Sequence, residues 1–237
     1  MLLFGKRYLG RSYRGYEITD YIGQGRYGAC FTAAAPDGSK VVLKRYHNRM
    51  RRKNKEKNHF EPVILSALNH PCIPSLLGVI NEGKDYFYIL EYMPGRSIET
   101  MLFTEHHRFS QSEVYEIGGK LIDIVSYLHA NHIVHRDIRI CNVLYDHTRA
   151  ALLDFGLARF SHEKEYPLDI DFSYLGDFLL YLIYSSYTKK SSGSRAWYNE
   201  LPLSSRQQLF LKRLLGLKPP YSSILQIKED FSRYFSC

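Results

Sequence analysis

The first ninety residues alternate between short apolar runs and turn residues, which is the pattern of a β-sheet. Five such runs follow one another, at residues 16–18, 30–32, 41–43, 73–80 and 86–90. Glycines, the turn Pro36-Asp37-Gly38 and a polar turn at residues 81–84 separate them. Short runs rich in β-branched and aromatic residues, bounded by turn residues, predict five strands.

Helical patterns appear once within this region and dominate after residue 95. Residues 58–68 carry apolar side chains at helical spacing. Ser110 and Glu113 have the spacing of a capping box, and an apolar helical face follows them. Further helices are predicted over residues 172–184, 209–217 and 224–235. The whole pattern predicts an α+β fold, with five strands and one helix followed by a mainly helical part.

The order of these elements predicts two lobes joined by a short hinge. The sequence shows no internal repeat and no long linker, so we expect one domain over residues 16–237. Its N-terminal lobe would span residues 16–90, the hinge 91–95 and its C-terminal lobe 96–237. Residues 1–15 are basic and lack clear periodicity, and we interpret them as an N-terminal extension.

Composition and charge narrow the class of protein. Hydrophobic residues make up 45% of the 237 residues, so the chain should fold rather than stay disordered. The net charge of +8 could attract nucleic acid, acidic proteins or an anionic membrane. The most basic stretch, residues 44–57, has no nucleic-acid-reading motif beside it, and we interpret it as a solvated loop.

The cysteines and the apolar runs indicate the compartment. The four cysteines are far apart and form no CxxC pair, which argues against a zinc site or a disulfide framework and favours a reducing compartment. No secretory signal follows Met1. The longest apolar run, residues 172–184, is shorter than the roughly 20 residues that a transmembrane helix needs. We therefore expect a soluble, cytoplasmic protein without a transmembrane segment.

A glycine-rich segment lies between the first two predicted strands. Gly23, Gly25 and Gly28 have a spacing that also fits a dinucleotide-binding turn or an ordinary hairpin. A dinucleotide-binding turn leads from a strand into a helix, whereas these glycines connect two strands. This context favours a β-hairpin flap whose backbone can lie over phosphates without a Cβ in the way.

Lys44 and Glu61 form a candidate ion pair. Lys44 ends the strand pattern 41–43, and Glu61 lies on the predicted helix. If Glu61 points back at Lys44, the pair holds the ammonium where it can bind the α- and β-phosphates of ATP. A solvated lysine and a surface carboxylate are the alternative. We favour the pair because Glu61 lies ten residues before Pro71, in the sequence Asn69-His70-Pro71.

Two short apolar runs further along the chain each end near a carboxylate. Asp137 follows the first run, with Asn142 five residues later on the same loop, and Asp154 follows the second run. Phosphoryl transfer needs a base, oxygen ligands for Mg²⁺ and cations that offset developing charge. Asp137 is the candidate base, Asn142 and Asp154 are candidate Mg²⁺ ligands, and Lys44 and Arg139 are the candidate cations. Two ordinary turn aspartates are the alternative.

Taken together and in this order, the segments resemble the protein-kinase family. The resemblance runs from residue 16 to 176 and rests on the following set: the glycine-rich loop, Val41-Val42-Leu43-Lys44, Glu61, His135-Arg136-Asp137, Asn142 and Asp154-Phe155-Gly156. It implies the bilobal protein-kinase fold, with ATP and Mg²⁺ as cofactors. It also implies transfer of the ATP γ-phosphate to a hydroxyl of a protein substrate, with a serine/threonine kinase favoured.

The resemblance implies further contacts with ATP. The backbones of Glu91 and Met93 would hydrogen-bond the adenine, and Ser97 lies where the family contacts the ribose. Cys30 takes the place of the usual valine of the glycine-rich strand. The apolar side chains that would line the adenine slot are Ile22, Cys30, Val42 and Leu144.

Three departures from the family pattern concern the substrate and the helix. Arg139 stands where serine/threonine kinases usually have lysine. Only fourteen residues separate Gly156 from Asp171, which resembles the buried aspartate that supports the catalytic loop, and the usual Ala-Pro-Glu tripeptide is missing. Pro62 directly follows Glu61, so the helix should be short and start near residue 58, since proline is tolerated only in a first turn.

These observations leave three functions open. We favour an active protein kinase that acts on itself or on another protein. A small-molecule kinase of the antibiotic or sugar phosphotransferase kind also works without an Ala-Pro-Glu segment, but such relatives typically lack a plain Asp-Phe-Gly and the Asn-His-Pro turn. A nucleotide-binding pseudokinase usually loses the lysine, the base or the magnesium aspartate, and this sequence retains Lys44, Asp137 and Asp154.

Overall fold

The structure, a computed structural model, describes residues 5–25, 28–46, 60–161, 165–188 and 195–236. The chain divides into two compact units, Met1–Met93 and Pro94–Cys237. This division falls within residues 91–95, the stretch predicted as a hinge. Most of the basic stretch 44–57 and the expected helix start at residue 58 lie outside the described residues.

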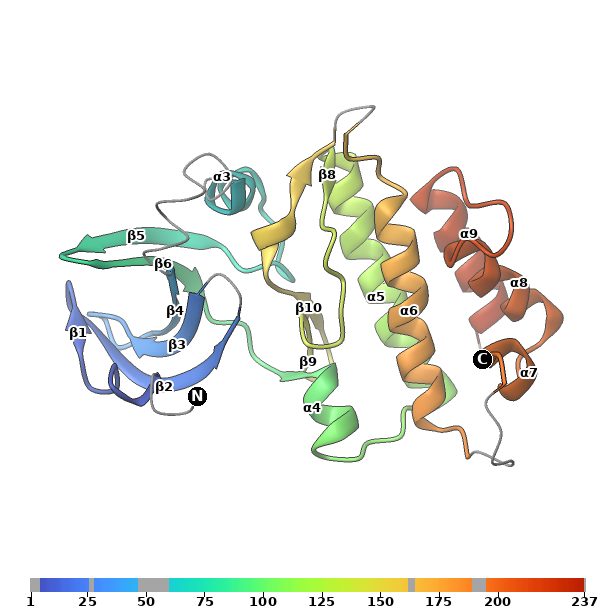
Figure 1. Cartoon of the computed structure of the whole chain (residues 1–237), viewed down its shortest axis with the longest axis horizontal. Helices are drawn as coiled ribbons and strands as arrows, with labels where there is room; N and C mark the ends of the chain where they lie inside the picture. The colour runs from blue at the N-terminus through green and yellow to red at the C-terminus, as the bar shows by residue number, and fades with distance from the viewer. Residues whose placement is uncertain (1–4, 26–27, 47–59, 162–164, 189–194, 237) are drawn as a thin grey trace. The chain divides into compact units, whose positions relative to one another are not determined.

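The first unit is built on an antiparallel sheet of six strands, drawn in blue to teal in Figure 1. The strand order is β1-β2-β3-β4-β6-β5. The strands are β1 (Ser12–Tyr13), β2 (Tyr16–Gln24), β3 (Gly28–Ala34), β4 (Lys40–Tyr46), β5 (Leu76–Glu82) and β6 (Asp85–Glu91). One helix of this unit, α3 (Phe60–Ala67), falls where the sequence predicts it.

The prediction of five strands was wrong, because β1 adds a sixth at the edge of the sheet. Ser12 pairs with Glu17 and Tyr13 with Tyr16. The turn between them consists of Arg14 and Gly15, both with positive φ, at 48° and 86°. Two positive φ angles are typical of the tight type I′ hairpin turn. A two-residue strand shows no periodicity, so its apolar pattern could not reveal it.

Side chains of the sheet alternate between two faces. One face forms the core of the unit, with Ala29 and Phe31 of β3 and Val41 and Leu43 of β4. Because successive side chains of a strand point to opposite faces, the residues between them, Cys30 and Val42, lie on the other face together with Lys44. The register also sets Cys30 directly opposite Lys44. The predicted nucleotide-binding side chains of β3 and β4 therefore share one face.

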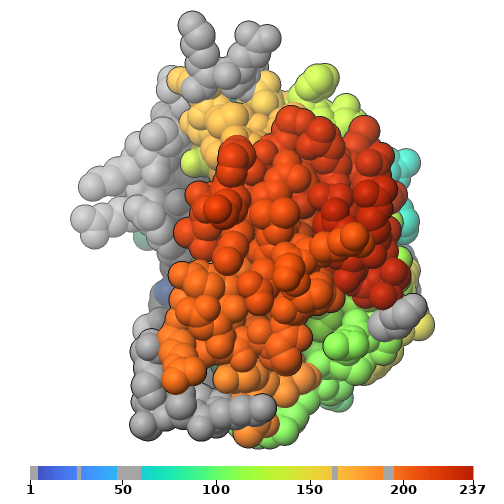
Figure 2. Space-filling model, turned by 90° about the vertical axis from the view of Figure 1, so that its right-hand side faces the viewer, coloured from blue at the N-terminus to red at the C-terminus, as the bar shows by residue number. Residues whose placement is uncertain are grey.

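The second unit is mainly helical, as the sequence predicts. Its helices are α4 (Ile98–Phe103), α5 (Gln111–Ala130), α6 (Ile170–Ser185), α7 (Trp197–Glu200), α8 (Ser205–Leu214) and α9 (Ile224–Phe235). Helices α5 and α6 run side by side, and α9 packs on α5 (Figure 1). Figure 2 shows the C-terminal helices, in orange to red, covering one face of this unit. No helix of the described residues is long and apolar enough to cross a bilayer.

Short strands of the second unit hold the loops that carry the candidate chemistry. Strands β7 (Arg96–Ser97), β9 (Val143–Tyr145) and β10 (Ala150–Leu152) form one small sheet in the order β10-β9-β7. Strands β8 (Ile133–Val134) and β11 (Arg159–Phe160) form another. The 3-10 helix η2 (Phe155–Leu157) lies between β10 and β11.

Capping explains where two of the helices begin. Ser110 accepts a hydrogen bond from the Glu113 N–H, and the Glu113 carboxylate accepts one from the Ser110 N–H, which confirms the predicted capping box of α5. Ser204 and Gln207 form a second box. Helix α8 therefore begins at Ser205, earlier than the predicted residue 209, because this signal precedes the apolar pattern.

Gly118, inside α5, has a packing reason that the sequence does not reveal. A Cβ at this position would lie 2.5 Å from the Phe231 ring and 2.9 Å from Leu179 Cδ2. At Gly119 the nearest neighbour, Phe231 Cε1, is 4.0 Å from such a Cβ, which is ordinary contact. The small residue at 118 thus allows α5 to approach α9 and α6 closely.

We expect Gly118→Ala to destabilise the protein and Gly119→Ala to leave it unchanged or to stabilise it. Alanine favours a helix over glycine by about 1 kcal/mol at either site. Overpacking at Gly118 costs about 1–3 kcal/mol, which offsets or exceeds that gain. Urea unfolding of both variants measures the difference between them. Equal free energies of unfolding would contradict the packing argument.

Candidate functional site

The first unit brings Lys44 and Glu61 together. Lys44 Nζ lies 2.6 Å from Glu61 Oε1, and the two residues are only 8% and 2% exposed. Strand β4 carries the lysine on the face opposite the core, and the first turn of α3 carries the glutamate. A buried charge requires a partner, so each residue supports the other in this position.

The three glycines of the predicted flap differ in their surroundings. A Cβ at Gly28 would lie 1.8 Å from the Arg45 carbonyl oxygen, because Gly28 pairs with Tyr46 where β3 and β4 meet. At Gly23 and Gly25, an added Cβ meets no described atom within 4 Å. Strand pairing therefore accounts for Gly28, whereas the packing of the described residues does not require a glycine at 23 or 25.

The residues predicted to contact adenine and ribose occupy several elements. Ile22 on β2 is 56% exposed, and Cys30 and Val42 are half-buried. The Glu91 N–H donates to the Ser75 carbonyl, so a Glu91 contact with adenine would come from its own carbonyl. Met93 is buried at the end of the first unit.

In the second unit, Ser97 and Leu144 are directly paired between β7 and β9. Ser97 is also the N-cap of α4, where its hydroxyl accepts from the Thr100 N–H. The predicted ribose and adenine contacts of this unit therefore lie on adjacent strands. These contacts stay predictions.

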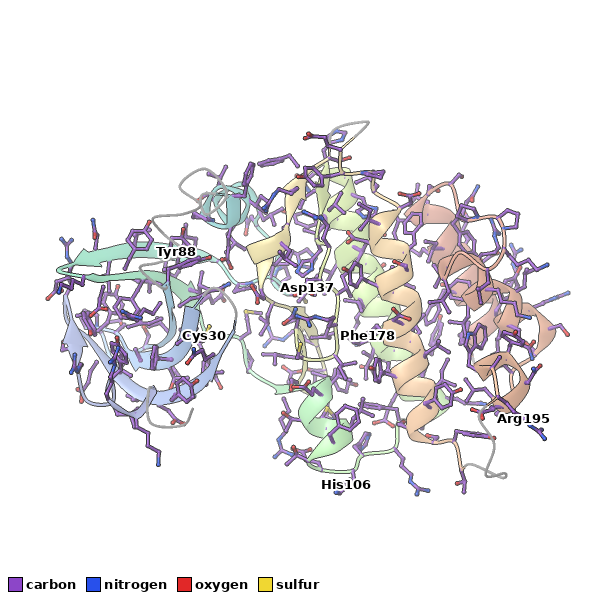
Figure 3. The ribbon with its side chains drawn as sticks, viewed as in Figure 1. Cys30, Tyr88, His106, Asp137, Phe178 and Arg195 are labelled. Atoms are coloured by element: carbon purple, nitrogen blue, oxygen red, sulfur yellow. The ribbon has the colours of Figure 1, made fainter. Side chains whose placement is uncertain are left out.

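Asp137, which is labelled in Figure 3, accepts hydrogen bonds from two side chains of its own loop. Arg139 approaches both carboxylate oxygens, with Nε 2.7 Å from Oδ1 and Nη2 2.9 Å from Oδ2. Asn142 Nδ2 donates to Asp137 Oδ2 and to the Asp137 carbonyl, each at 2.9 Å. Hydrogen bonds to Asp137 raise the pKa of the Arg139 guanidinium above its usual value. The loop thus presents a carboxylate held in place by a bidentate arginine.

Asp154 lies beside Asn142 because of the β9–β10 ladder. Leu152 pairs with Val143, and the Leu153 N–H donates to the Asn142 carbonyl at 2.8 Å. Asp154 follows with a left-handed φ of 60° and accepts from the Gly156 N–H at 3.2 Å. Non-glycine residues rarely adopt this conformation, and such residues cluster at functional sites. Asn142 and Asp154 therefore come from neighbouring strand ends.

The buried side chain of His135 connects the loop that carries Asp137 to the loop that carries Asp154. The ring is fully buried, which lowers the pKa of His135 and keeps the imidazole neutral. Its Nε2 lies 3.1 Å from the Leu153 carbonyl and its Nδ1 accepts from the Asp137 N–H at 3.3 Å. The proton therefore resides on Nε2. The ring also packs edge-on against Phe155, with centroids 4.7 Å apart. One side chain thus fixes the spacing between the Asp137 and Asp154 loops.

Asp171 anchors the same loop from α6. It is fully buried and accepts from the backbone N–H groups of His135, at 2.9 Å, and Arg136, at 2.8 Å. His129 Nε2 on α5 lies 3.1 Å from its Oδ2. These contacts match the supporting role that the resemblance implies for Asp171. They also hold Arg136 at a positive φ of 67°.

The oxygen donors near Asp137 suit Mg²⁺. Among the residues that the structure describes, no group of three or more His, Cys, Asp or Glu side chains could hold a metal alone. Mg²⁺ binds through one or two side chains together with substrate phosphates and waters, so such a cluster is not needed. Asn142 turns its amide nitrogen toward Asp137, so its amide oxygen, which also lies 3.6 Å from Cys141 Sγ, is the candidate ligand atom. Asn142 and Asp154 therefore fit a magnesium ion.

The segment between Gly156 and Asp171 is short and makes its own contacts. The Arg136 guanidinium lies 4.6 Å from the Tyr166 ring centroid, and its Nη1 donates to the Leu157 carbonyl at 3.2 Å. Strand β11 pairs with β8 at the start of the segment. Arg136 thus has partners within this segment, which favours a structural role for it.

Comparison with known proteins agrees with this arrangement. A family model described as "Protein kinase domain" matches residues 16–190. The chain is 34% identical over 231 residues to the protein named "Probable serine/threonine-protein kinase YbdM" of Bacillus subtilis. That alignment covers 92% of this chain and 88% of the relative.

Two longer relatives match a smaller part of the chain. "Serine/threonine-protein kinase C" of Synechocystis is 28% identical over 156 residues, which are 61% of this chain and 29% of that protein. A G-type lectin S-receptor-like serine/threonine-protein kinase of Arabidopsis thaliana is 28% identical over 170 residues, covering 69% of this chain and 23% of that protein. The similarity to these two is therefore confined to part of their length.

Proposed function

Because the chain belongs to the protein kinase family and is a protein kinase, we propose that it transfers the γ-phosphate of ATP to a serine or threonine hydroxyl. The acceptor would be a protein, either another chain or the kinase itself. The names of the relatives, all serine/threonine-protein kinases, support this acceptor class.

The proposal assigns a role to each group of the site. Lys44, held by Glu61, binds the α- and β-phosphates. Asp137 orients the acceptor hydroxyl and takes its proton, and Asn142 keeps the carboxylate in place. Arg139 offsets negative charge on the transferred phosphoryl group. For this its guanidinium must contact the phosphoryl oxygens in addition to the Asp137 carboxylate, or move from the carboxylate to them. Mg²⁺, bound by Asn142 and Asp154, would neutralise phosphate charge.

The observation that carries the proposal is the hydrogen-bonded set around Asp137. A pair of ordinary turn aspartates would require no bidentate arginine, no amide donor and no buried histidine linking the two loops. The shortened segment after Gly156 is the observation that favours a second candidate, a small-molecule kinase. That candidate uses the same base and the same ATP groups but a different acceptor.

Labelling with radioactive ATP and Mg²⁺ tests the proposal. Purified protein is incubated alone and with generic basic proteins and peptides as acceptors. We expect label on protein, stable in acid as a phosphate ester of serine or threonine. ATP binding without labelled protein would replace this proposal with a small-molecule kinase or a pseudokinase. Adding small-molecule hydroxyl acceptors to the same assay would then separate the two, because only the small-molecule kinase would label one of them.

A further inference from the structure

Tyr46 lies two residues after Lys44 on β4, beside the ion pair. Alternation along a strand sends the side chains of residues 44 and 46 to the same face. There the Tyr46 hydroxyl donates a hydrogen bond to Glu61 Oε2, while Lys44 donates to Oε1. Each oxygen of the Glu61 carboxylate therefore has its own donor from β4. None of the roles assigned above uses this second contact.

Burial and ring packing keep the Tyr46 hydroxyl in place as a donor. Tyr46 is only 5% exposed, and burial raises the pKa of its phenol far above the usual value, so the group stays protonated. Its ring packs edge-on against Tyr88 of β6, which is labelled in Figure 3, with centroids 4.9 Å apart. Tyr88 in turn packs against Tyr86 at 5.5 Å. This row of rings restricts the directions in which the hydroxyl can point.

The first turn of helix α3 needs such a contact, because the buried apolar residues that fix the helix, Ile64 and Leu65, come after that turn begins. The helix has eight described residues, and isolated helices shorter than about 12–15 residues are marginal in water. Glu61 lies in its first turn, where helices fray most readily. Pro62, directly after Glu61, is tolerated there because the N–H groups of a first turn have no intrahelical acceptor, so no helical hydrogen bond donated from this position holds it. The position of the Glu61 carboxylate therefore depends on tertiary contacts.

We infer that Tyr46 is a positioning residue for phosphoryl transfer, which holds Glu61 so that Glu61 can hold Lys44. The inference rests on the proposed role of Lys44 in binding ATP. Tyr46 acts through Glu61 and touches neither the nucleotide nor the acceptor. It joins β4 to α3 by a hydrogen bond that a phenylalanine of the same shape could not make.

Tyr46→Phe tests the inference, with Tyr13→Phe as its matched control. Tyr13 is also buried in the first unit and donates to a carboxylate, Asp85 Oδ2, at 3.0 Å, away from Glu61. Both variants lose one hydroxyl–carboxylate hydrogen bond, so they should lose similar stability. We expect Tyr46→Phe to lower kcat/KM for ATP by roughly ten- to a hundredfold, the usual effect of a hydrogen bond to a charged group. Tyr13→Phe should change it less than about twofold.

A double variant shows whether Tyr46 acts through Glu61. Once Glu61→Ala has removed the acceptor of the Tyr46 hydroxyl, adding Tyr46→Phe should cost less than about a further twofold, because coupled residues are not additive. If Tyr46→Phe lowered kcat/KM as much in the Glu61 variant as it does in the wild type, the inference would be overturned. Equal activity of Tyr46→Phe and the wild type, while the wild type labels protein, would also overturn it, and the proposed function would then stand.

Hydrogen exchange provides a readout that needs no turnover. Backbone amides of residues 60–67 should exchange faster in Tyr46→Phe than in the wild type or in Tyr13→Phe, since a loosened α3 opens more often. Unchanged exchange there would overturn the inference even if the wild type proved inactive. If the wild type labelled no protein but residues 60–67 exchanged faster in Tyr46→Phe, the proposed function alone would be rejected.

Discussion

Asp137→Asn is expected to abolish measurable phosphoryl transfer while ATP binding is retained. Asparagine has the shape of aspartate, and its one amide oxygen can still accept from Asn142 and from Arg139 Nη2, although the second Arg139 contact is lost. Asn142 also donates to the backbone carbonyl of residue 137, so the loop should keep its geometry. It cannot take up the proton of an acceptor hydroxyl. A general base contributes about 10²–10⁴-fold to the rate. The loss should therefore appear in kcat, measured with labelled ATP, and not in the affinity for the nucleotide.

Asp123→Asn is the control for this variant. Asp123 is an exposed aspartate of the same unit, 2.7 Å from Lys228 Nζ. An exposed ion pair contributes little to stability, so this change should leave both activity and nucleotide binding at wild-type values. Full activity of Asp137→Asn would reject Asp137 as the base. Loss of nucleotide binding in the same variant would point to an effect on the loop instead.

Local signals were enough to predict most of the elements in the fold. Strands β3 and β4 are buried along most of their seven residues, so the sequence shows them as short apolar runs. The Ser110 capping box marked the start of α5 directly. The same signal at Ser204 and Gln207 marks α8 and could have been recognised. Strand β1 could not have been recognised, because its pairing depends on a two-residue turn that only Gly15 marks in the sequence.

In the candidate site, too, the sequence predicted some contacts, whereas others depend on tertiary packing. The order of motifs predicted that Lys44 and Glu61 meet, and they do. Nothing in the sequence marked Tyr46, since a tyrosine near a strand end is ordinary, and its contact exists only once α3 packs on the sheet. His135 was recognised as part of a motif. Its link between the Asp137 N–H and the Leu153 carbonyl depends on how two distant loops meet.

Arg139 shows how a departure from the family pattern acquires a physical meaning. The sequence allowed a phosphate contact, because an arginine can bind phosphate bidentately. In the structure two of its nitrogens, Nε and Nη2, donate to Asp137. A lysine would present a single point charge and could not hold both carboxylate oxygens in this planar way. Arg139 therefore fixes the orientation of the Asp137 carboxylate, the candidate base. The lysine that serine/threonine kinases usually have at this position would not do so.

Asp154→Asn is expected to remove the magnesium-dependent part of nucleotide binding together with turnover. Asparagine tolerates the left-handed φ of 60° and can still accept from the Gly156 N–H, so the backbone should be preserved. The change removes the only full negative charge among the two proposed Mg²⁺ ligands, Asn142 and Asp154. A bound metal ion supplies several kcal/mol of charge stabilisation, so the loss of turnover should be about a hundredfold or more.

Titrating nucleotide binding with and without Mg²⁺ separates this effect from simple misfolding. The wild type should bind ATP more tightly when Mg²⁺ is added, and Asp154→Asn should bind equally with and without it. Asp146→Asn is the matched control, since Asp146 also accepts backbone N–H groups in a turn, those of Thr148 and Arg149, at the other end of β9 and β10. It should keep the magnesium response. If Asp154→Asn still bound ATP more tightly with Mg²⁺, Asp154 would be rejected as a Mg²⁺ ligand. Its role would then be to form the turn, and another residue would have to bind the metal.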